Sequence, residues 1–332
     1  MNKAVIHIGM DKTGTTAIQS YCNEHRAFLL SHGWFYPRGK GDNFFSHIDF
    51  AAQHGFLWNK NATEQTSAVA ELGFDEYPTF QPDQLLLSSE CFCQYSDVRS
   101  IHRLKEWLVA RGFEAQTIVV YLRNQADWLV SLYGESIKWG STSTISEFYD
   151  AQRERMFRST LLAQWSDVFG LENMQVRSYD NCHGDVLVDF IETVLAMEAG
   201  VVRHVRDFVP FFSNSSTSQI LLENIRSSKL ETDPNELFEF LYNTVLRKAP
   251  VHLKDLFRRR IWKLPEGFLA ELDAIEADNE LVTRTYGLAG GKVTSQWAIS
   301  YMETVREIDS AQVATAAMLL HQDLASGLIT SS

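Results

Sequence analysis

The sequence predicts an α/β fold in which a parallel β-sheet is flanked by helices. Four compact runs of apolar or β-branched residues have the length of buried strands, and helical patterns lie between them. Runs of this kind, which do not alternate with polar residues, are typical of parallel strands covered on both faces. Strands that alternate with helices favour right-handed crossovers within one sheet. We therefore expect three layers, with helices on both faces of the sheet.

The elements follow a regular order in the first part of the chain. The expected strands are residues 4–8, 84–88, 117–122 and 174–179. The expected helices between them are residues 15–31, 97–111, 126–138 and 159–169. The segment 37–83 interrupts this order with several Pro and Gly residues, and it contains a helical piece near 46–56. Because an insertion of this length is often functional, we expect it to form a wall of a binding pocket.

After residue 185 the chain is predicted to be mostly helical. The helical patterns cover residues 185–197, 216–228, 234–248, 253–261, 266–284 and 310–326. No low-complexity linker divides the chain cleanly. We therefore expect an α/β core of residues 1–200, which contains the 37–83 insertion, and a helical lobe of residues 201–332 that packs on the same domain.

Composition argues against several classes of protein. The net charge of −12 argues against a nucleic-acid binder, whose surface would be basic, and disfavours a long polyanionic acceptor. No window approaches 18 apolar residues, so no membrane span is expected. The four cysteines match neither a zinc pattern nor a disulfide framework, and no metal is expected. Because Met1 runs almost directly into the first strand, we expect no signal peptide and a cytoplasmic protein.

A loop with the features of a phosphate site follows the first predicted strand. It joins strand 4–8 to the helix from residue 15 and reads Gly9-Met10-Asp11-Lys12-Thr13-Gly14-Thr15-Thr16. The backbone N–H groups of such a turn converge on one point, the helix dipole favours an anion there, and Lys12 adds a positive charge. The alternative is a turn in which Gly14 only reverses the chain. We favour an anion site formed by Lys12, Thr13, Gly14, Thr15 and Thr16.

The order of residues in this loop differs from that of an ATP-binding loop. The ATP-binding pattern has two glycines five residues apart, followed at once by Lys and Ser or Thr. Here Lys12 precedes Gly14, and three threonines surround that glycine. The difference favours another phosphate donor, and a nucleotide-dependent kinase with a variant loop is the alternative.

A second set of polar residues follows the strand 117–122. Arg123 comes directly after the strand, and Ser131 lies eight residues later, within the next expected helix. Ligands of open α/β sheets bind at the carboxyl ends of the strands. An Arg fork with a facing hydroxyl suits a second phosphate, separate from the one at residues 12–16. Two separate phosphate sites favour a nucleotide that carries phosphates at two positions.

With both motifs present, the chain resembles the sulfotransferases that use 3′-phosphoadenosine 5′-phosphosulfate (PAPS), in particular the small bacterial type. The family loop Pro-Lys-Ser/Thr-Gly-Thr-Thr stands here as residues 11–16, with Asp11 in place of proline. The family motif Arg-Asn-x-x-Asp-x-x-x-Ser stands here as Arg123, Asn124, Asp127 and Ser131. The resemblance covers about residues 3–195 and implies a sheet like that of the P-loop nucleotide-binding proteins.

This resemblance implies transfer of a sulfuryl group from PAPS, which leaves adenosine 3′,5′-bisphosphate (PAP). The loop of residues 12–16 would bind the 5′-phosphosulfate, and Arg123 with Ser131 would bind the 3′-phosphate. Lys12 would neutralise the charge that grows on the oxygen between phosphorus and sulfur. The acceptor would be a hydroxyl or amine of a carbohydrate or another small molecule. A non-catalytic nucleotide-binding protein of the same fold is a further alternative.

The acceptor's proton requires a base, and the family uses either His or Glu in this role. Glu90 follows the strand 84–88 and is expected at the ligand edge of the sheet, where a salt bridge or a helix cap is its alternative role. His47 lies in the 37–83 insertion and titrates in the useful pH range, although a packed histidine is the commoner case. Both residues are therefore candidate bases.

Overall fold

The computed structural model describes most of the α/β part and several helices of the remainder. The described residues are 2–38, 46–56, 82–94, 97–182, 185–198, 205, 218–227, 234, 238, 260–288 and 296–305. The chain divides into two units that interleave along the sequence. The first unit consists of Met1–Arg123, Phe157–Ser213 and Ile275–Thr294, and the second of Asn124–Met156, Asn214–Ala274 and Ser295–Ser332.

The first unit contains a five-stranded sheet in which every neighbouring pair is parallel. The strands are β1 (Lys3–Ile8), β2 (Trp34–Phe35), β3 (Gln84–Ser89), β4 (Ala115–Leu122) and β5 (Met174–Ser178). Their order across the sheet is β2-β3-β1-β4-β5. Lys3 pairs with Gln84 on one side and with Ala115 on the other, so β1 lies at the centre. The four predicted strands are confirmed, and β2 is an additional strand of two residues.

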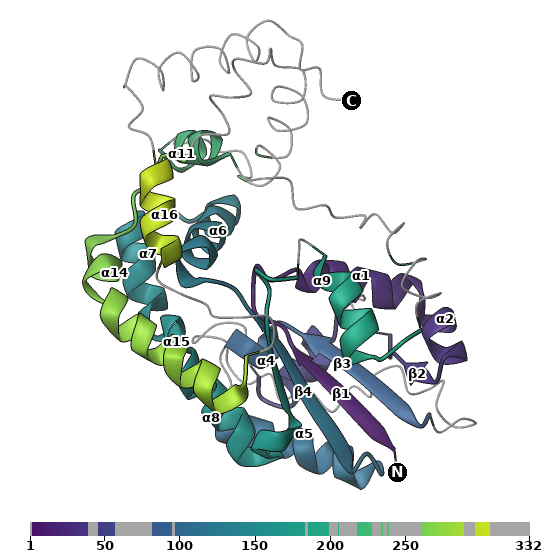
Figure 1. The fold of residues 1–332 in the computed structure, drawn as a ribbon. Coiled ribbons are helices and arrows are strands. Elements are labelled where there is room, and N and C mark those ends of the chain that lie inside the picture. Colours follow the sequence, from purple (N-terminus) through teal and green to yellow (C-terminus); the bar gives the residue numbers. More distant parts are fainter. Residues whose placement is uncertain are drawn as a thin grey trace, which may run out of the picture. The chain divides into compact units, whose positions relative to one another are not determined.

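Helices cover both faces of this sheet. Figure 1 shows α1 (Thr15–Glu24) and α9 (Val186–Asp189) on one face, and α5 (Val98–Ala110) and α8 (Arg158–Phe169) on the other. On the first face Val5, Leu86 and Val119 are buried in a cluster with residues of α1 and α9. The predicted α/β fold with a parallel sheet flanked by helices is therefore confirmed.

Several predicted helices are divided in the structure. The expected helix 15–31 consists of α1 and α2 (Arg26–Ser31), separated at His25. The expected helix 185–197 consists of α9 and a π-helix (Phe190–Val194). Two short helices, α3 (Ile48–Gln53) and α4 (Cys91–Gln94), complete the first unit before β4.

Side chains cap the starts of α5 and α8 in the first unit. Asp97 accepts a hydrogen bond from the backbone N–H of Ser100 at the start of α5. The start of α8 is capped by Asp278 of α15 (Leu272–Tyr286), whose carboxylate accepts from the N–H of Arg158 at 2.6 Å. These caps supply partners for N–H groups that a helix leaves unpaired at its beginning.

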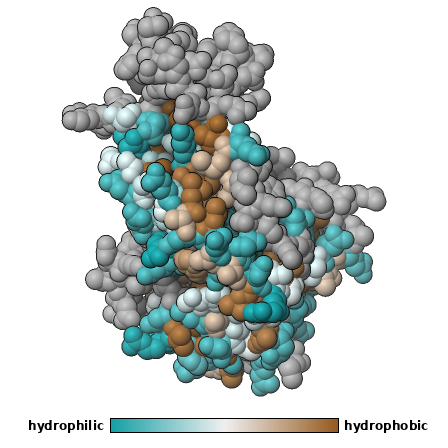
Figure 2. Space-filling view, turned by 60° about the vertical axis from the view of Figure 1, so that its left-hand side comes forward, coloured by the Kyte–Doolittle hydropathy of each residue, from teal (hydrophilic) through white to brown (hydrophobic). Residues whose placement is uncertain are grey.

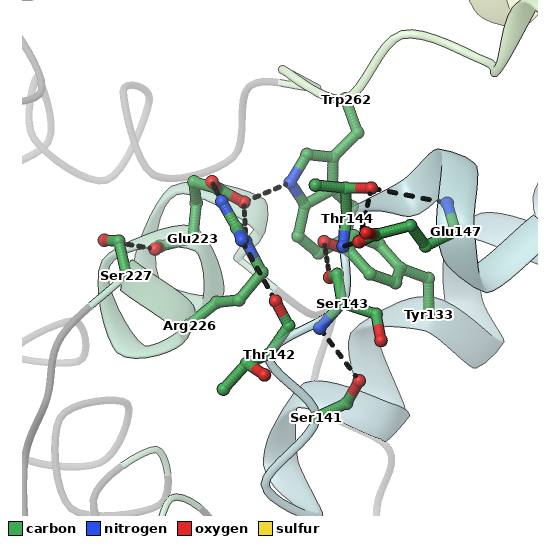
Figure 3. A network of polar contacts seen from close by, with 10 residues as sticks. All are labelled: Tyr133, Ser141, Thr142, Ser143, Thr144, Glu147, Glu223, Arg226, Ser227 and Trp262. Atoms are coloured by element: carbon green, nitrogen blue, oxygen red, sulfur yellow. Dashed lines mark hydrogen bonds and ion pairs between the residues drawn. The ribbon is translucent and has the colours of Figure 1, made fainter.

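The second unit is helical in its described part. It contains α6 (Gln125–Lys138), α7 (Ile145–Gln152), α11 (Gln219–Ser227), α14 (Glu266–Ala270) and α16 (Gln296–Thr304). Figure 3 shows a polar network in which Glu223 pairs with Arg226 and accepts a hydrogen bond from the indole of Trp262. In the same network Tyr133 donates to the carbonyl of Ser143 at 2.9 Å. Arg226 also donates to the carbonyl of Thr142 at 3.3 Å, and this bond joins α11 to the α6–α7 connection inside one unit.

On the face drawn in Figure 2, hydrophobic residues are interspersed with hydrophilic ones. Within the described ranges, no helix combines the length and the apolar character that a membrane span needs. The expected helix 216–228 corresponds to α11, and 266–284 corresponds to α14 and α15. The expected helices 234–248, 253–261 and 310–326 lie almost entirely outside the described residues.

Candidate functional site

The loop between β1 and α1 is held in an unusual backbone conformation. Lys12 has φ 62° and Gly14 has φ 79°, so both lie in the left-handed region. For a residue other than glycine this region costs about 1–2 kcal/mol, and such strain is often found at functional sites. The hydroxyl of Thr13 donates to the carbonyl of Met10 at 2.6 Å and so helps to close the loop.

The first turn of α1 has no side-chain cap and no acidic residue. The carbonyl of Gly14 accepts from the N–H groups of Ala17 and Ile18, which begins the helix. In the same unit, by contrast, α5 and α8 are capped by Asp97 and Asp278. An uncapped helix start next to a Lys-bearing loop is suited to an anion, because the helix dipole favours negative charge there.

Gly14 is required by its neighbours as well as by its backbone angles. A Cβ at this position would overlap Cγ1 of Val186 and would lie 3.3 Å from Cε2 of Tyr179. Val186 begins α9, and Tyr179 follows β5 directly. The loop thus approaches two other elements of the sheet unit at a distance that no side chain on Gly14 would allow.

Arg123 lies beside this loop. Its Nη1 donates to the carbonyl of Lys12 at 3.1 Å, and its guanidinium carbon lies 5.4 Å from the ring centroid of Tyr179. Its Nε is buried and has no hydrogen-bond partner within the described part of the chain. The guanidinium therefore supports the strained residue of the loop and retains a donor that an anion could use.

An ion pair anchors the helix that contacts Gly14. Arg177 of β5 donates from both Nε and Nη2 to the carboxylate of Asp189, at 2.7 and 2.6 Å, and Tyr121 of β4 donates to the same group at 2.6 Å. Burial alone would raise the pKa of Asp189, but these hydrogen bonds outweigh it and the pKa lies below its usual value. A charged Asp189 therefore fixes α9 against the sheet.

Glu90 lies on the other side of the loop. It follows β3, and its carboxylate accepts a hydrogen bond from the hydroxyl of Thr15, the first residue of α1. Gly9 makes this approach possible, because a Cβ there would lie 2.7 Å from Cγ2 of Thr15 and 3.5 Å from Cγ of Glu90. The structure thus brings Glu90 to the predicted phosphate loop.

Asp11 of the loop is buried, with 6% of its surface exposed. Its carboxylate accepts a hydrogen bond from the side-chain amide of Gln94, at 2.7 Å. The amide comes from α4, which follows Glu90 in the chain. This contact gives the buried carboxylate a neutral partner beside the loop.

The ring of His47 is buried and hydrogen-bonded to the backbone. The ring is 1% exposed, Nδ1 accepts a hydrogen bond from the N–H of Ser88 at 2.9 Å, and Nε2 lies 2.9 Å from the carbonyl of Pro37. Burial lowers the pKa of His47 to about 4, although the two backbone hydrogen bonds act in the opposite direction. Both ring nitrogens therefore bond to the backbone in this structure, and the expectation that His47 is a base stays a prediction.

The second motif contains structural as well as candidate binding residues. Asn124 caps α6, because its side chain accepts from the N–H of Asp127 at 2.9 Å and donates to the carboxylate of that residue. Ser131 is half-buried on the same helix, in the second unit. Its predicted role toward a phosphate therefore stays a prediction from the motif.

Two contributors to the site were not among the predicted residues. Tyr179 stacks on Arg123 and borders Gly14, while Val186 packs against Gly14. Tyr179 had a positional signal, because an aromatic residue directly after the last strand lies at the ligand edge of the sheet. Val186 gave no signal, since its contact depends on how α9 packs.

Cysteines and acidic residues give no evidence of a metal centre in the described part. All four cysteines are free thiols. Within the residues that the structure describes, no group of three or more His, Cys, Asp and Glu side chains is placed to hold a metal ion. The candidate site contains the loop between β1 and α1 and the start of α1. Its charged side chains are the cations Lys12 and Arg123 and the carboxylates of Asp11 and Glu90.

Comparison with solved structures finds a similar protein chain. It is a sulfotransferase from Alicyclobacillus acidocaldarius, with 17% sequence identity and a TM-score of 0.38. The match covers 79% of this chain and 98% of that chain. No protein-family model matches the sequence. No curated protein matches it either.

Proposed function

We propose that this protein is a sulfotransferase that moves the sulfuryl group of PAPS to a hydroxyl or amine of a small acceptor. The observation that carries the proposal is the contact between the two motifs. Arg123, the first residue of the second motif, donates to the carbonyl of Lys12 in the first motif at 3.1 Å. Both cationic residues therefore lie at one edge of the sheet, beside a helix start without a cap.

The residues of the loop fit the 5′-phosphosulfate group of the donor. The uncapped N–H groups of α1 and the hydroxyls of Thr15 and Thr16 would hold its oxygens, and Gly14 permits the backbone to approach closely. The buried Nε of Arg123 supplies a further donor for the nucleotide. Ser131 is included on the sequence motif alone, as a ligand of the 3′-phosphate.

The proposed reaction is an in-line displacement at sulfur. A lone pair of the acceptor oxygen forms the new S–O bond, while the bond from sulfur to the bridging oxygen of the 5′-phosphate breaks. The electron pair of the broken bond stays on that phosphate oxygen and yields PAP, and Lys12 neutralises the charge that develops there. The proton of the acceptor hydroxyl passes to the carboxylate of Glu90.

Glu90 is proposed as the base because of where it lies. Its carboxylate contacts the first residue of α1, whereas His47 has both ring nitrogens engaged by backbone groups. Catalysis would then consist of positioning and electrostatic stabilisation, as in phosphoryl transfer. The acceptor is proposed to be a carbohydrate or another small hydroxylated molecule, in keeping with the net charge of −12.

A transfer assay tests this function directly. Purified protein is incubated with PAPS that carries labelled sulfate and with a panel of hydroxylated and amino acceptors, and labelled product is separated from donor. The proposal predicts label on at least one acceptor and about 100-fold or more less label with Lys12→Ala. Donor binding without transfer to any acceptor of a broad panel would instead indicate a non-catalytic nucleotide-binding protein.

A further inference from the structure

The hydroxyl of Thr15 has two potential partners in this site. In the structure it donates its proton to the carboxylate of Glu90. In the proposed function the same hydroxyl donates to the 5′-phosphosulfate of the donor. A threonine hydroxyl carries one proton and can donate to one strong acceptor at a time. The donor's phosphate and Glu90 therefore compete for the same hydrogen.

The backbone around this pair is fixed, so the competition concerns side chains. The N–H of Gly9 donates to the carbonyl of Ser89 at 3.0 Å, which joins the ends of β1 and β3. The carbonyl of Glu90 accepts from the N–H of Cys93 at 3.0 Å, which begins α4. Thr15 is 2% exposed and therefore buried. Its hydroxyl can exchange partners by rotation, without movement of the strands.

We infer that Thr15 couples binding of the donor to the availability of Glu90 as a base. Without the donor, the Thr15 hydroxyl occupies one carboxylate oxygen of Glu90. When the donor's phosphate takes that hydroxyl, the carboxylate loses the hydrogen bond from Thr15 and becomes a stronger proton acceptor for the incoming hydroxyl. This inference rests on the proposed function, and it adds an order of events in which the donor binds before the base is available.

The competition has a measurable consequence for donor affinity. Replacing Glu90 by Gln turns a charged competitor for the Thr15 hydroxyl into a weaker, neutral acceptor, and it removes a negative charge beside the phosphate. Glu90→Gln is therefore expected to bind PAP about tenfold more tightly than the wild type, the ratio expected for loss of one charged hydrogen-bond partner. The same variant is expected to transfer sulfate about 100-fold more slowly, because it lacks the base.

Calorimetric titration of PAP into four proteins tests the link. The proteins are the wild type, Glu90→Gln, Thr15→Val and the double variant. The gain in PAP affinity from Glu90→Gln is expected to fall to about threefold or less in the Thr15→Val background. In that background the substitution only removes the charge repulsion between Glu90 and the phosphate. An equal gain in PAP affinity in both backgrounds, or no gain in either, overturns the inference. If the wild type nevertheless binds PAP, the proposed function stands. No PAP binding to the wild type overturns both.

Two further variants control for charge and for folding. Glu106→Gln removes the same charge from an exposed residue of α5 and is expected to leave the affinity for PAP within about twofold. If Glu106→Gln gained as much PAP affinity as Glu90→Gln, the effect would come from net charge, and the inference would be overturned. Thr15→Ser keeps the hydroxyl, so the full gain from Glu90→Gln is expected in its background, and loss of that gain contradicts the inference even if Thr15→Val fails to fold.

Discussion

Lys12 combines a strained backbone with the proposed catalytic charge. Its φ of 62° is unfavourable for any residue with a Cβ, and its carbonyl is held by Arg123. The side chain and the backbone of this residue can therefore be tested separately. Glycine removes the amine and the steric strain together, whereas alanine removes the amine alone.

We predict that Lys12→Ala and Lys12→Gly both lower turnover by about 100- to 1000-fold, because each removes the cation that stabilises the leaving oxygen. The free energy of unfolding of Lys12→Gly is expected to stay within about 1 kcal/mol of the wild type, since relief of strain offsets the entropy of glycine. Steady-state kinetics and chemical denaturation measure the two effects. Exposed Lys263→Ala is the control, and loss of less than about tenfold in both Lys12 variants contradicts the role.

His47 is buried, and both of its ring nitrogens bond to backbone groups. We predict that His47→Ala lowers the free energy of unfolding by about 3 kcal/mol, because the N–H of Ser88 and the carbonyl of Pro37 lose their partner. Turnover per folded molecule is expected to stay within about threefold, against about 100-fold for Glu90→Gln. Denaturation curves and active-site-normalised rates measure the two effects, and the reverse ranking of the two variants would identify His47 as the base.

At the scale of elements, the site depends on the close approach of α9 to the loop. We predict that Gly14→Ala destabilises the protein and weakens PAP binding, because its Cβ overlaps Val186 and its φ of 79° is unfavourable. Val186→Ala makes room, so the double variant is expected to recover at least about 1 kcal/mol relative to the sum of the single changes. Additive losses in thermal or chemical denaturation would show that the Gly14–Val186 contact is unimportant.

Sequence patterns predicted the central elements and missed those that depend on neighbours. The runs at 4–8, 84–88, 117–122 and 174–179 are strands because compact apolar runs suit strands buried on both faces. The two-residue strand β2 exists only through its pairing with β3, so no local pattern marks it. No Pro or Gly stands at the helix break at His25, so the sequence does not indicate it. The cap of α8 comes from Asp278, about 120 residues away in sequence.

The candidate site was predictable to the extent that it follows strand ends. Lys12, Glu90 and Arg123 each come directly after a strand or in the loop that follows one, and parallel strands bring such residues to one edge. His47 could not be judged in this way, because its hydrogen bonds depend on the tertiary position of Ser88. The contact of Val186 with Gly14 likewise depends on the packing of α9.

For the whole molecule, buried neutral histidines make stability depend on pH. Burial lowers the pKa of His47 from 6.5 to about 4 and that of His7 from 6.5 to about 3. Between these values and 6.5 the unfolded chain binds more protons than the folded one, so stability falls as the pH is lowered through this window. Each histidine contributes about 1.4 kcal/mol per pH unit there.

We therefore predict that the free energy of unfolding falls between about pH 6 and pH 5, and that His7→Asn reduces this slope by about 1.4 kcal/mol per pH unit. Asparagine can keep the hydrogen bond that Nδ1 of His7 makes with the hydroxyl of Ser88 at 2.8 Å. Urea denaturation at a series of pH values measures the slope. His102→Asn, an exposed residue of α5, is expected to leave it unchanged, and an unchanged slope in His7→Asn contradicts the assignment.

The sheet edge that carries Lys12 and Arg123 is proposed to bind a nucleotide with separate 5′- and 3′-phosphate groups. The most direct test is calorimetric titration of the wild-type protein with PAP and, separately, with ATP and Mg²⁺. We predict tight binding of PAP and no detectable binding of ATP with Mg²⁺, because Lys12 precedes Gly14 and Arg123 supplies a second cationic donor. Tight binding of ATP with Mg²⁺ and none of PAP would contradict it and would indicate a kinase.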